Sequence, residues 1–219
     1  MILNLIKEKV LQKIDFDAII KNARYFKSII GNAKLCAVIK NDAYGHGIVH
    51  TARFLSGAVD FFAVGSVDEA EKAADCSREV LILLPQNYAN TCKAIKTNCL
   101  LTVDSFDTLM TVCEAAKIMN VKAKVHIKID SGMSRLGFSV SDIKPLLKAI
   151  KKCGYIDVQG VYSHFWGDTL DACDKQYESF LYCANSLGDG LGKDLIRHIA
   201  NSSAALLSDK YRLDMVRIG

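Results

Sequence analysis

Proline is scarce in this sequence, with two among 219 residues, and no Ser-, Gly- or Pro-rich stretch or charge block divides the chain. We therefore expect one large domain. Long hydrophobic runs are also missing, because the longest, such as residues 80–84, are far below the ~20 residues of a membrane helix. The first residues lack the basic start and cleavage site of a signal peptide. These absences predict a cytoplasmic protein without membrane contact.

The eight cysteines contain no C-x-x-C pair, so the common zinc and redox motifs are excluded. Most stand in apolar contexts, as Cys36 does, and we predict reduced core thiols and no disulfide framework. The net charge of +4 is small and the basic residues are dispersed, which gives no reason to expect a nucleic-acid partner. Half of the residues are hydrophobic, so the chain is not disordered.

What the sequence does contain is a regular alternation of short β-rich runs and amphipathic stretches. Strands that alternate with helices form right-handed βαβ units and a parallel sheet. Eight such units favour a closed α/β barrel of the TIM type, (β/α)8, although an open doubly wound sheet gives much the same pattern. The predicted strands are 34–39, 60–64, 79–84, 98–103, 122–129, 156–163, 194–199 and 214–218.

Three stretches have clear helical periodicity. One covers 19–30 and stops at Gly31, a second begins after the potential cap Ser105, and a third covers 177–187 and ends at Gly188. Shorter stretches at 48–56, 67–75, 88–96, 141–152 and 202–208 are weaker helix candidates.

The first residues lie outside this repeat. We expect residues 1–14 to form an N-terminal extension, in which Lys9–Ile14 is an extra strand that needs a partner, and residues 15–219 to form the barrel. An unpaired strand of this kind would be prone to aggregation.

Polar residues follow almost every predicted strand, and in a barrel the strand ends carry the active site. They include a lysine, two arginines, a histidine and several hydroxyls, without a dominant carboxylate pair or metal cluster. The set is Lys40, Asn41, Tyr44, Ser66, residues 85–87, Asp104, residues 130–135, His164, residues 201–203 and Arg217.

The strongest signal is the run KNDAYGHG at residues 40–47, which follows a buried strand. Apolar surroundings disfavour an ammonium, and a lysine kept partly neutral can form a Schiff base with an aldehyde. Position alone favours the alternative, a lysine whose amine extends to solvent. The residue types therefore leave two interpretations of Lys40 open.

The run resembles the pyridoxal-phosphate lysine motif of alanine racemases, K-x-x-A-Y-G-H-G. Later blocks resemble the same family in the same order, at residues 126–138, 161–165, 198–204 and 214–219. The resemblance implies the N-terminal barrel domain of a cytoplasmic isomerase that interconverts L- and D-alanine. Its cofactor would be pyridoxal 5'-phosphate, and its product would supply peptidoglycan synthesis.

The resemblance implies that Lys40 holds the cofactor and is one of two racemisation bases. It also implies that Tyr44 and Ser202 contact the phosphate, with Asn201 and Gly219 beside them. Asn201 and Ser202 open a predicted helix, where unpaired amides suit an anion. A turn-packing aromatic at Tyr44 and a plain helix cap at Ser202 remain as alternatives.

Three further matches concern the substrate and the ring. Arg135 matches the arginine that binds the substrate carboxylate through its planar fork. Lys128 matches a lysine that is carbamylated in many family members and helps to orient that arginine, but it also fits an ordinary barrel lysine. His164 would lie against the pyridine ring, or would be a core histidine.

Arg217 matches the arginine that faces the pyridine nitrogen, and His198 would support it from the neighbouring strand. A permanently charged arginine keeps that nitrogen unprotonated, which makes the ring a weaker electron sink. The resemblance therefore implies simple proton return in preference to side reactions.

Racemisation needs bases on opposite faces of the α-carbon. In the family, the second base is a tyrosine in the C-terminal domain of the partner subunit, and none of the eight tyrosines here matches that motif. The chain stops at Gly219, the end of the last predicted strand. We therefore expect the C-terminal domain to be missing, little racemisation by this chain alone, and a homodimer for the full-length family member.

Trp166 stands where the family has small residues, which leaves the choice between alanine and serine open. Two other functions also remain open. A non-catalytic barrel for pyridoxal-phosphate homeostasis fits the length but gives Arg135 and Arg217 no purpose. A membrane-tethered serine racemase would need membrane helices upstream.

Overall fold

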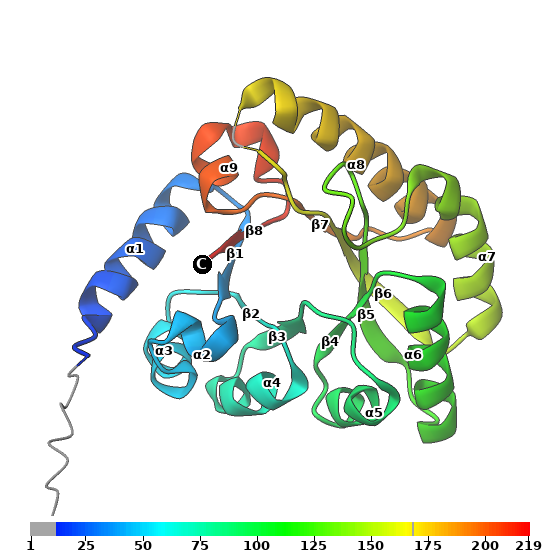
Figure 1. Cartoon of the computed structure of the whole chain (residues 1–219), viewed down its shortest axis with the longest axis horizontal. Helices are drawn as coiled ribbons and strands as arrows, with labels where there is room; N and C mark the ends of the chain where they lie inside the picture. The colour runs from blue at the N-terminus through cyan, green and yellow to red at the C-terminus, as the bar shows by residue number, and fades with distance from the viewer. Residues whose placement is uncertain (1–11, 168) are drawn as a thin grey trace, which may run out of the picture.

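The computed structural model describes residues 12–167 and 169–219, and its core is one sheet of eight parallel strands. The order β7-β6-β5-β4-β3-β2-β1-β8 follows the chain, and Arg217 N donates to Ala200 O (3.1 Å) where β8 meets β7. The fold is therefore a (β/α)8 barrel (Figure 1), and the open doubly wound alternative is wrong. The strands are β1 Lys34–Val38, β2 Phe61–Val64, β3 Glu79–Ile82, β4 Leu100–Val103, β5 Ala123–Lys128, β6 Ile156–Tyr162, β7 Ile196–His198 and β8 Met215–Ile218.

Helices surround the sheet (Figure 1), and α1 precedes the first strand and packs against β1 and α3. No helix within the described ranges is long and apolar enough to cross a membrane. The α-helices are α1 Phe16–Ile29, α2 Lys40–Tyr44, α3 Ile48–Leu55, α4 Val67–Ala73, α5 Tyr88–Lys96, α6 Phe106–Met119, α7 Ile143–Cys153, α8 Leu170–Leu191 and α9 Ser202–Leu207, with short 3-10 turns at η1 Ala74–Cys76, η2 Val140–Asp142 and η3 Asp209–Tyr211.

The predicted helix starts and stops are largely confirmed. Ser105 caps α6 by accepting from Thr108 N (3.2 Å), and Gly31 follows α1. The predicted stop at Gly188 is wrong, because α8 continues to Gly192, which has a left-handed conformation. Gly190 lies inside the helix for a packing reason, since a Cβ there would come within 2.5 Å of Leu147 Cδ1. Half of the expected strand Lys9–Ile14, residues 9–11, lies outside the described residues, and no strand is present at 12–14.

The barrel interior divides into an apolar and a polar half. Cys36, Phe61, Leu81, Leu100 and Met215, with Ala63, form a buried cluster contributed by β1–β4 and β8. The polar half lies along β5–β8. Its buried side chains are His126, Lys128, Tyr162, His198 and Arg217.

A β-bulge in β6 determines which of its residues face the polar half of the interior. Val125 pairs with Val158, but the next residue His126 pairs with Gly160, so Gln159 is an extra residue in β6. One extra residue reverses the alternation of a strand. Gly160 and Tyr162 consequently face the interior beside His126 and Lys128.

Cys113 and Cys153 form a disulfide between α6 and α7, with Cα atoms 6.2 Å apart. The prediction of reduced thiols is wrong for this pair. The two residues are 40 positions apart, and only the packing of neighbouring barrel helices brings them together. We expect mass-tagging of thiols in the denatured, unreduced protein to spare Cys113 and Cys153.

Candidate functional site

A polar pocket of about 220 Å³ opens at the C-terminal ends of the strands. Every residue to which the family resemblance gives a role, except His198, lines it, whereas the other polar residues predicted at the strand ends do not. These lining residues are Lys40, Tyr44, Lys128, Arg135, His164, Asn201, Ser202, Arg217 and Gly219, and Val38, Leu83, Leu84, Leu136 and Tyr162 complete the wall.

Lys40 stands at the junction of β1 and an unusual turn. The four residues that follow, Asn41–Tyr44, all have positive φ values of 53–54°. Left-handed backbone costs an L-residue about 1–2 kcal/mol. A run of four such residues therefore needs support from elsewhere in the fold.

Glu69 in α4 supplies that support. Its Oε1 accepts from Asn41 N and its Oε2 accepts from Gly65 N, both at 2.7 Å. Asp42 Oδ1 also accepts from Ile48 N (2.8 Å), which ties the turn to α3. The sequence analysis missed Glu69, because a Ser-x-x-Glu pattern beginning at Ser66 is typical of a local helix cap. Here the carboxylate joins the ends of β1 and β2.

Replacing Glu69 with glutamine is expected to lower the free energy of unfolding by about 1–3 kcal/mol, because an amide nitrogen cannot accept from a backbone N–H. Urea denaturation measures the change. Asp68→Asn is the matched control, since Asp68 makes an exposed ion pair with Lys93 (3.2 Å) that contributes little. Equal stabilities of the two variants would contradict this role of Glu69.

Arg217 is the most extensively bonded side chain of the pocket. Its Nη1 donates to His198 Nδ1 (2.8 Å), and its Nη2 donates to Ser163 O (2.7 Å) and Ile199 O (3.3 Å). Nη2 also lies 3.3 Å from His164 Nδ1. Carbonyl and imidazole acceptors therefore hold this buried guanidinium, and none of these partners is acidic.

The pocket as a whole carries positive charge. Lys40, Lys128, Arg135 and Arg217 line it, whereas none of its described lining residues is Asp or Glu. Burial, followed by the charge of Arg217, lowers the pKa of His164 to about 4, so this imidazole is neutral at pH 7. Such a pocket favours an anionic ligand. In the described part of the chain, no three metal-ligating side chains gather.

Lys128 responds to the same positive charge. Burial and then Arg217 lower its pKa to about 7. Its Nζ donates to Ile129 O (3.1 Å) and lies 5.2 Å from the centre of the Tyr162 ring. The amine is thus partly neutral near physiological pH.

The lowered pKa of Lys128 predicts a pH-dependent stability. Between about pH 7 and the ordinary lysine range near ~10.4, the folded state binds fewer protons than the unfolded state, so the free energy of unfolding rises with pH. Lys128→Met should remove this rise, as measured by urea denaturation across that range in buffer freed of carbon dioxide, where the amine is unmodified. Lys124→Met, on the same strand, should keep it. A wild-type curve with the slope of the Lys128→Met curve would contradict the shift.

Tyr162 is a site residue that the sequence analysis left without a role. Its hydroxyl lies 2.8 Å from Thr102 Oγ1 and donates to Leu83 O (3.2 Å), and its ring stacks on His198 with centroids 4.9 Å apart. Burial raises the pKa of Tyr162 to about 12, which keeps the phenol protonated. Tyr162 therefore packs against His198 and is a poor candidate for a catalytic base.

The loop after β5 presents Arg135. Asp130 Oδ1 accepts from Gly132 N and Ser134 N, both at 3.0 Å, and Phe138 N donates to Lys128 O (2.9 Å) to close the loop. Local acceptors thus fix the backbone that carries the guanidinium into the pocket.

The opposite side of the pocket combines hydroxyls with the end of β8. Ser202 Oγ lies 3.4 Å from both Gly219 N and Gly219 O. A Cβ at Gly219 would lie 3.1 Å from Tyr44 Oη and 3.0 Å from Val38 Cβ, so a larger residue would crowd this corner. Asn201 Oδ1 caps α9 by accepting from Ala204 N (2.9 Å).

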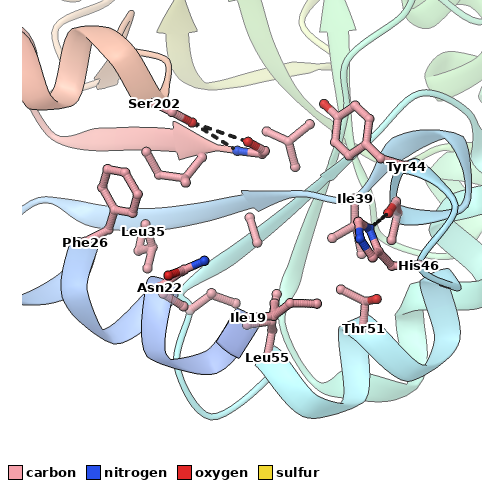
Figure 2. Close-up of a pocket in the computed structure, with 17 residues that line it drawn as sticks. Ile19, Asn22, Phe26, Leu35, Ile39, Tyr44, His46, Thr51, Leu55 and Ser202 are labelled. Atoms are coloured by element: carbon pink, nitrogen blue, oxygen red, sulfur yellow. Dashed lines mark hydrogen bonds between the residues drawn. The ribbon is translucent and has the colours of Figure 1, made fainter. Parts of the chain in front are cut away.

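A second, apolar cavity of about 460 Å³ adjoins this corner, between α1 and the β1–β8 edge. Figure 2 shows Tyr44 and Ser202 on the side opposite to Ile19 and Leu55. Among its described lining residues there is no Lys, Arg, Asp or Glu, and it shares Tyr44, Ser202 and Gly219 with the polar pocket.

Trp166 does not line the polar pocket, and 64% of its surface is exposed. Gln176 holds the backbone of this loop, because its Oε1 accepts from Trp166 N (2.8 Å) and its Nε2 donates to Trp166 O (2.7 Å). Trp166 therefore does not form part of the wall of the polar pocket.

Residues 14–219 match the family described as alanine racemase, N-terminal domain. The chain belongs to this family. It is 34% identical to alanine racemase 1 of Oceanobacillus iheyensis over 216 residues, and 35% identical to alanine racemase 1 of Caldanaerobacter subterraneus subsp. tengcongensis over 218 residues. A crystal structure of alanine racemase from Streptomyces lavendulae superposes with a TM-score of 0.88 at 29% identity, covering 94% of this chain and 56% of that one.

These matches concern one part of the alanine racemase fold. They cover 94% of this chain but only 57% and 55% of the two relatives. The chain thus spans little more than half the length of the curated relatives that it matches.

Proposed function

We propose that residues 15–219 form the cofactor-binding barrel of a pyridoxal-phosphate-dependent alanine racemase, an isomerase that interconverts L- and D-alanine. One observation carries this function: Lys40, Arg135 and Arg217 line a single pocket of about 220 Å³. An amine, a carboxylate-binding fork and a buried cation form the set that this reaction requires.

The donor set also fits the cofactor. The hydroxyls of Tyr44 and Ser202 and the glycine corner at Gly219 suit a phosphate group, with Asn201 beside them. Lys40 supplies the amine for the aldehyde, and His164 supplies a neutral ring beside Arg217. When bound, pyridoxal phosphate serves as an electron sink for the α-carbon.

Proton transfer, binding of the substrate carboxylate and contact with the pyridine ring fall to different residues of the pocket. Lys40 moves a proton at the α-carbon, and Arg135 binds the substrate carboxylate. Arg217, supported by His198, would supply the cation beside the pyridine nitrogen and would disfavour protonation of that nitrogen. Tyr162 is unsuited to act as the opposing base, because burial raises its pKa to about 12.

We infer that Lys128 is carbamylated, which turns a cation into an anion that orients Arg135. The partly neutral amine at pH 7 supports this reaction with carbon dioxide. A ¹³C resonance that appears with ¹³C-bicarbonate and is absent in Lys128→Arg is the expected sign. Identical spectra of the two proteins would exclude the carbamate.

Hydrogen exchange at the α-carbon tests the function. We load the chain with pyridoxal phosphate in D₂O and incubate it separately with L-alanine and D-alanine. Because the described pocket holds one proton-transferring lysine, we expect deuterium to enter only one enantiomer, with little racemisation. Lys40→Arg should abolish the exchange.

The other outcomes separate the alternatives. Cofactor binding without exchange in either enantiomer would favour the non-catalytic homeostasis barrel. Racemisation at ordinary enzyme rates would show that a second base lies within these residues. Faster exchange with serine than with alanine would favour a serine racemase.

The proposed setting follows from the family. The enzyme would act in the cytoplasm, supply D-alanine for peptidoglycan, and assemble as a homodimer at full length. It would need no nucleic acid or membrane partner.

A further inference from the structure

The polar half of the barrel contains a hydrogen-bonded series that extends behind the pocket. Arg217 Nη1 lies 2.8 Å from His198 Nδ1, and His198 Nε2 lies 2.8 Å from His126 Nδ1. All three side chains are buried, with exposed fractions of 5%, 0% and 0%. The series therefore links Arg217 in the pocket to His126 in β5.

The direction of the series is fixed by chemistry. A guanidinium has no acceptor, so Arg217 donates and His198 Nδ1 accepts. A neutral imidazole carries one N–H, which places the hydrogen of His198 on Nε2 and makes it the donor to His126 Nδ1. The hydrogen of His126 then resides on Nε2, which has no partner in the described structure.

Both rings are neutral in this setting. Burial, followed by the charge of Arg217, lowers the pKa of His126 to about 3. Burial likewise holds the pKa of His198 well below its ordinary value. The charges nearest to His198 are Arg217 and Lys128, and both oppose protonation.

We propose that His126 is a positioning residue, the final acceptor of an Arg217–His198–His126 relay that holds the Arg217 guanidinium in the pocket. This inference rests on the proposed function, which gives Arg217 its role beside the cofactor. Accepting from His198 Nε2 fixes that ring and polarises it, which strengthens Nδ1 as the acceptor for Arg217.

The surrounding backbone is shaped to hold this ring. The bulge at Gln159 turns Gly160 toward His126, and a Cβ at position 160 would lie only 2.6–2.7 Å from three ring atoms. Tyr162 stacks on His198 with an interplanar angle of 4°. Glycine and bulge together create a space that fits the His126 ring at the end of the series.

Long-range ¹H–¹⁵N correlation spectra of the histidine-labelled chain, without cofactor, test the relay directly. We expect His198 and His126 both to carry the hydrogen on Nε2. A hydrogen on Nδ1 of His126 would reverse the second bond and overturn the proposal.

Two substitutions at position 126 distinguish the loss of the hydrogen-bond acceptor from a change in side-chain volume. His126→Asn places an amide oxygen near the position of Nδ1, whereas His126→Phe fills the space without an acceptor. We expect the exchange rate of the His198 Nε2–H to rise about tenfold in His126→Phe and to stay near wild type in His126→Asn. Equal rates in the two variants would overturn the proposal.

Gly160→Ala provides a test that keeps the histidine. Its Cβ should displace the His126 ring and raise the same exchange rate, and an unchanged rate would count against the relay. With pyridoxal phosphate added, His126→Phe should weaken cofactor binding more than His126→Asn. If no variant and no wild-type chain bound the cofactor, the proposed function would fail, while the spectra of the unloaded chain would still decide the relay.

Discussion

Lys40→Ala is expected to abolish the yellow band near ~420 nm that the wild-type chain should develop with pyridoxal phosphate, because the lysine amine forms the Schiff base. Lys40 is the lysine that directly follows β1 and lines the polar pocket. The expected effect is complete loss of the band. Absorption spectra during titration with the cofactor measure it.

Lys34→Ala is the matched control, because Lys34 begins the strand that Lys40 follows and lies 5.7 Å from the centre of the Phe61 ring, outside the pocket. Its spectrum should equal that of the wild type. Borohydride reduction followed by peptide mapping should place the adduct on Lys40. An unchanged band in Lys40→Ala would refute the cofactor assignment.

Gly137→Ala is expected to lower the free energy of unfolding by about 3 kcal/mol, the upper range for a forced overpacking. Gly137 has a φ of 125°, and its Cβ would lie 2.5 Å from Asp130 N and 2.6 Å from Ile129 C. These are backbone atoms at the end of β5, so they cannot rotate away. The loop that carries Arg135 must shift or open.

Gly154→Ala isolates the steric part of this effect. Gly154 also has a positive φ, 72°, but no atom lies within 4 Å of its Cβ position. It should lose only about 1 kcal/mol, the cost of left-handed backbone. Urea denaturation of both variants gives the comparison, and equal losses would mean that the crowding at Gly137 is relieved without cost.

Local periodicity was sufficient to predict the eight parallel strands but not the closure of the sheet, because burial of both faces leaves continuous apolar runs in an open sheet and in a barrel alike. The predicted strands 34–39 and 60–64 illustrate this, and the structure places β1 and β2 there within one position. The grouping of Lys40, Arg135 and Arg217 was also predictable, since strand ends meet at one face of a barrel.

The features that sequence analysis missed depend on contacts between distant segments. Glu69 supports Asn41 across 28 positions, and Gln159 is recognisable as a bulge only from the pairing of β5 with β6. The end of α8 was misplaced at Gly188, because the sequence alone does not distinguish this glycine from Gly192, which has the left-handed conformation that ends the helix. Propensity scales describe neither kind of contact.

The left-handed turn after Lys40 also couples the folding of the first two strand–helix units of the barrel. One of its supports comes from α4, so we expect residues 41–44 to reach their native conformation fully only when the second strand–helix unit has docked on the first. Local opening of α4 would release the turn. The amide of Asn41, whose acceptor is Glu69, thus reports on the cooperativity of these two units in native-state hydrogen exchange.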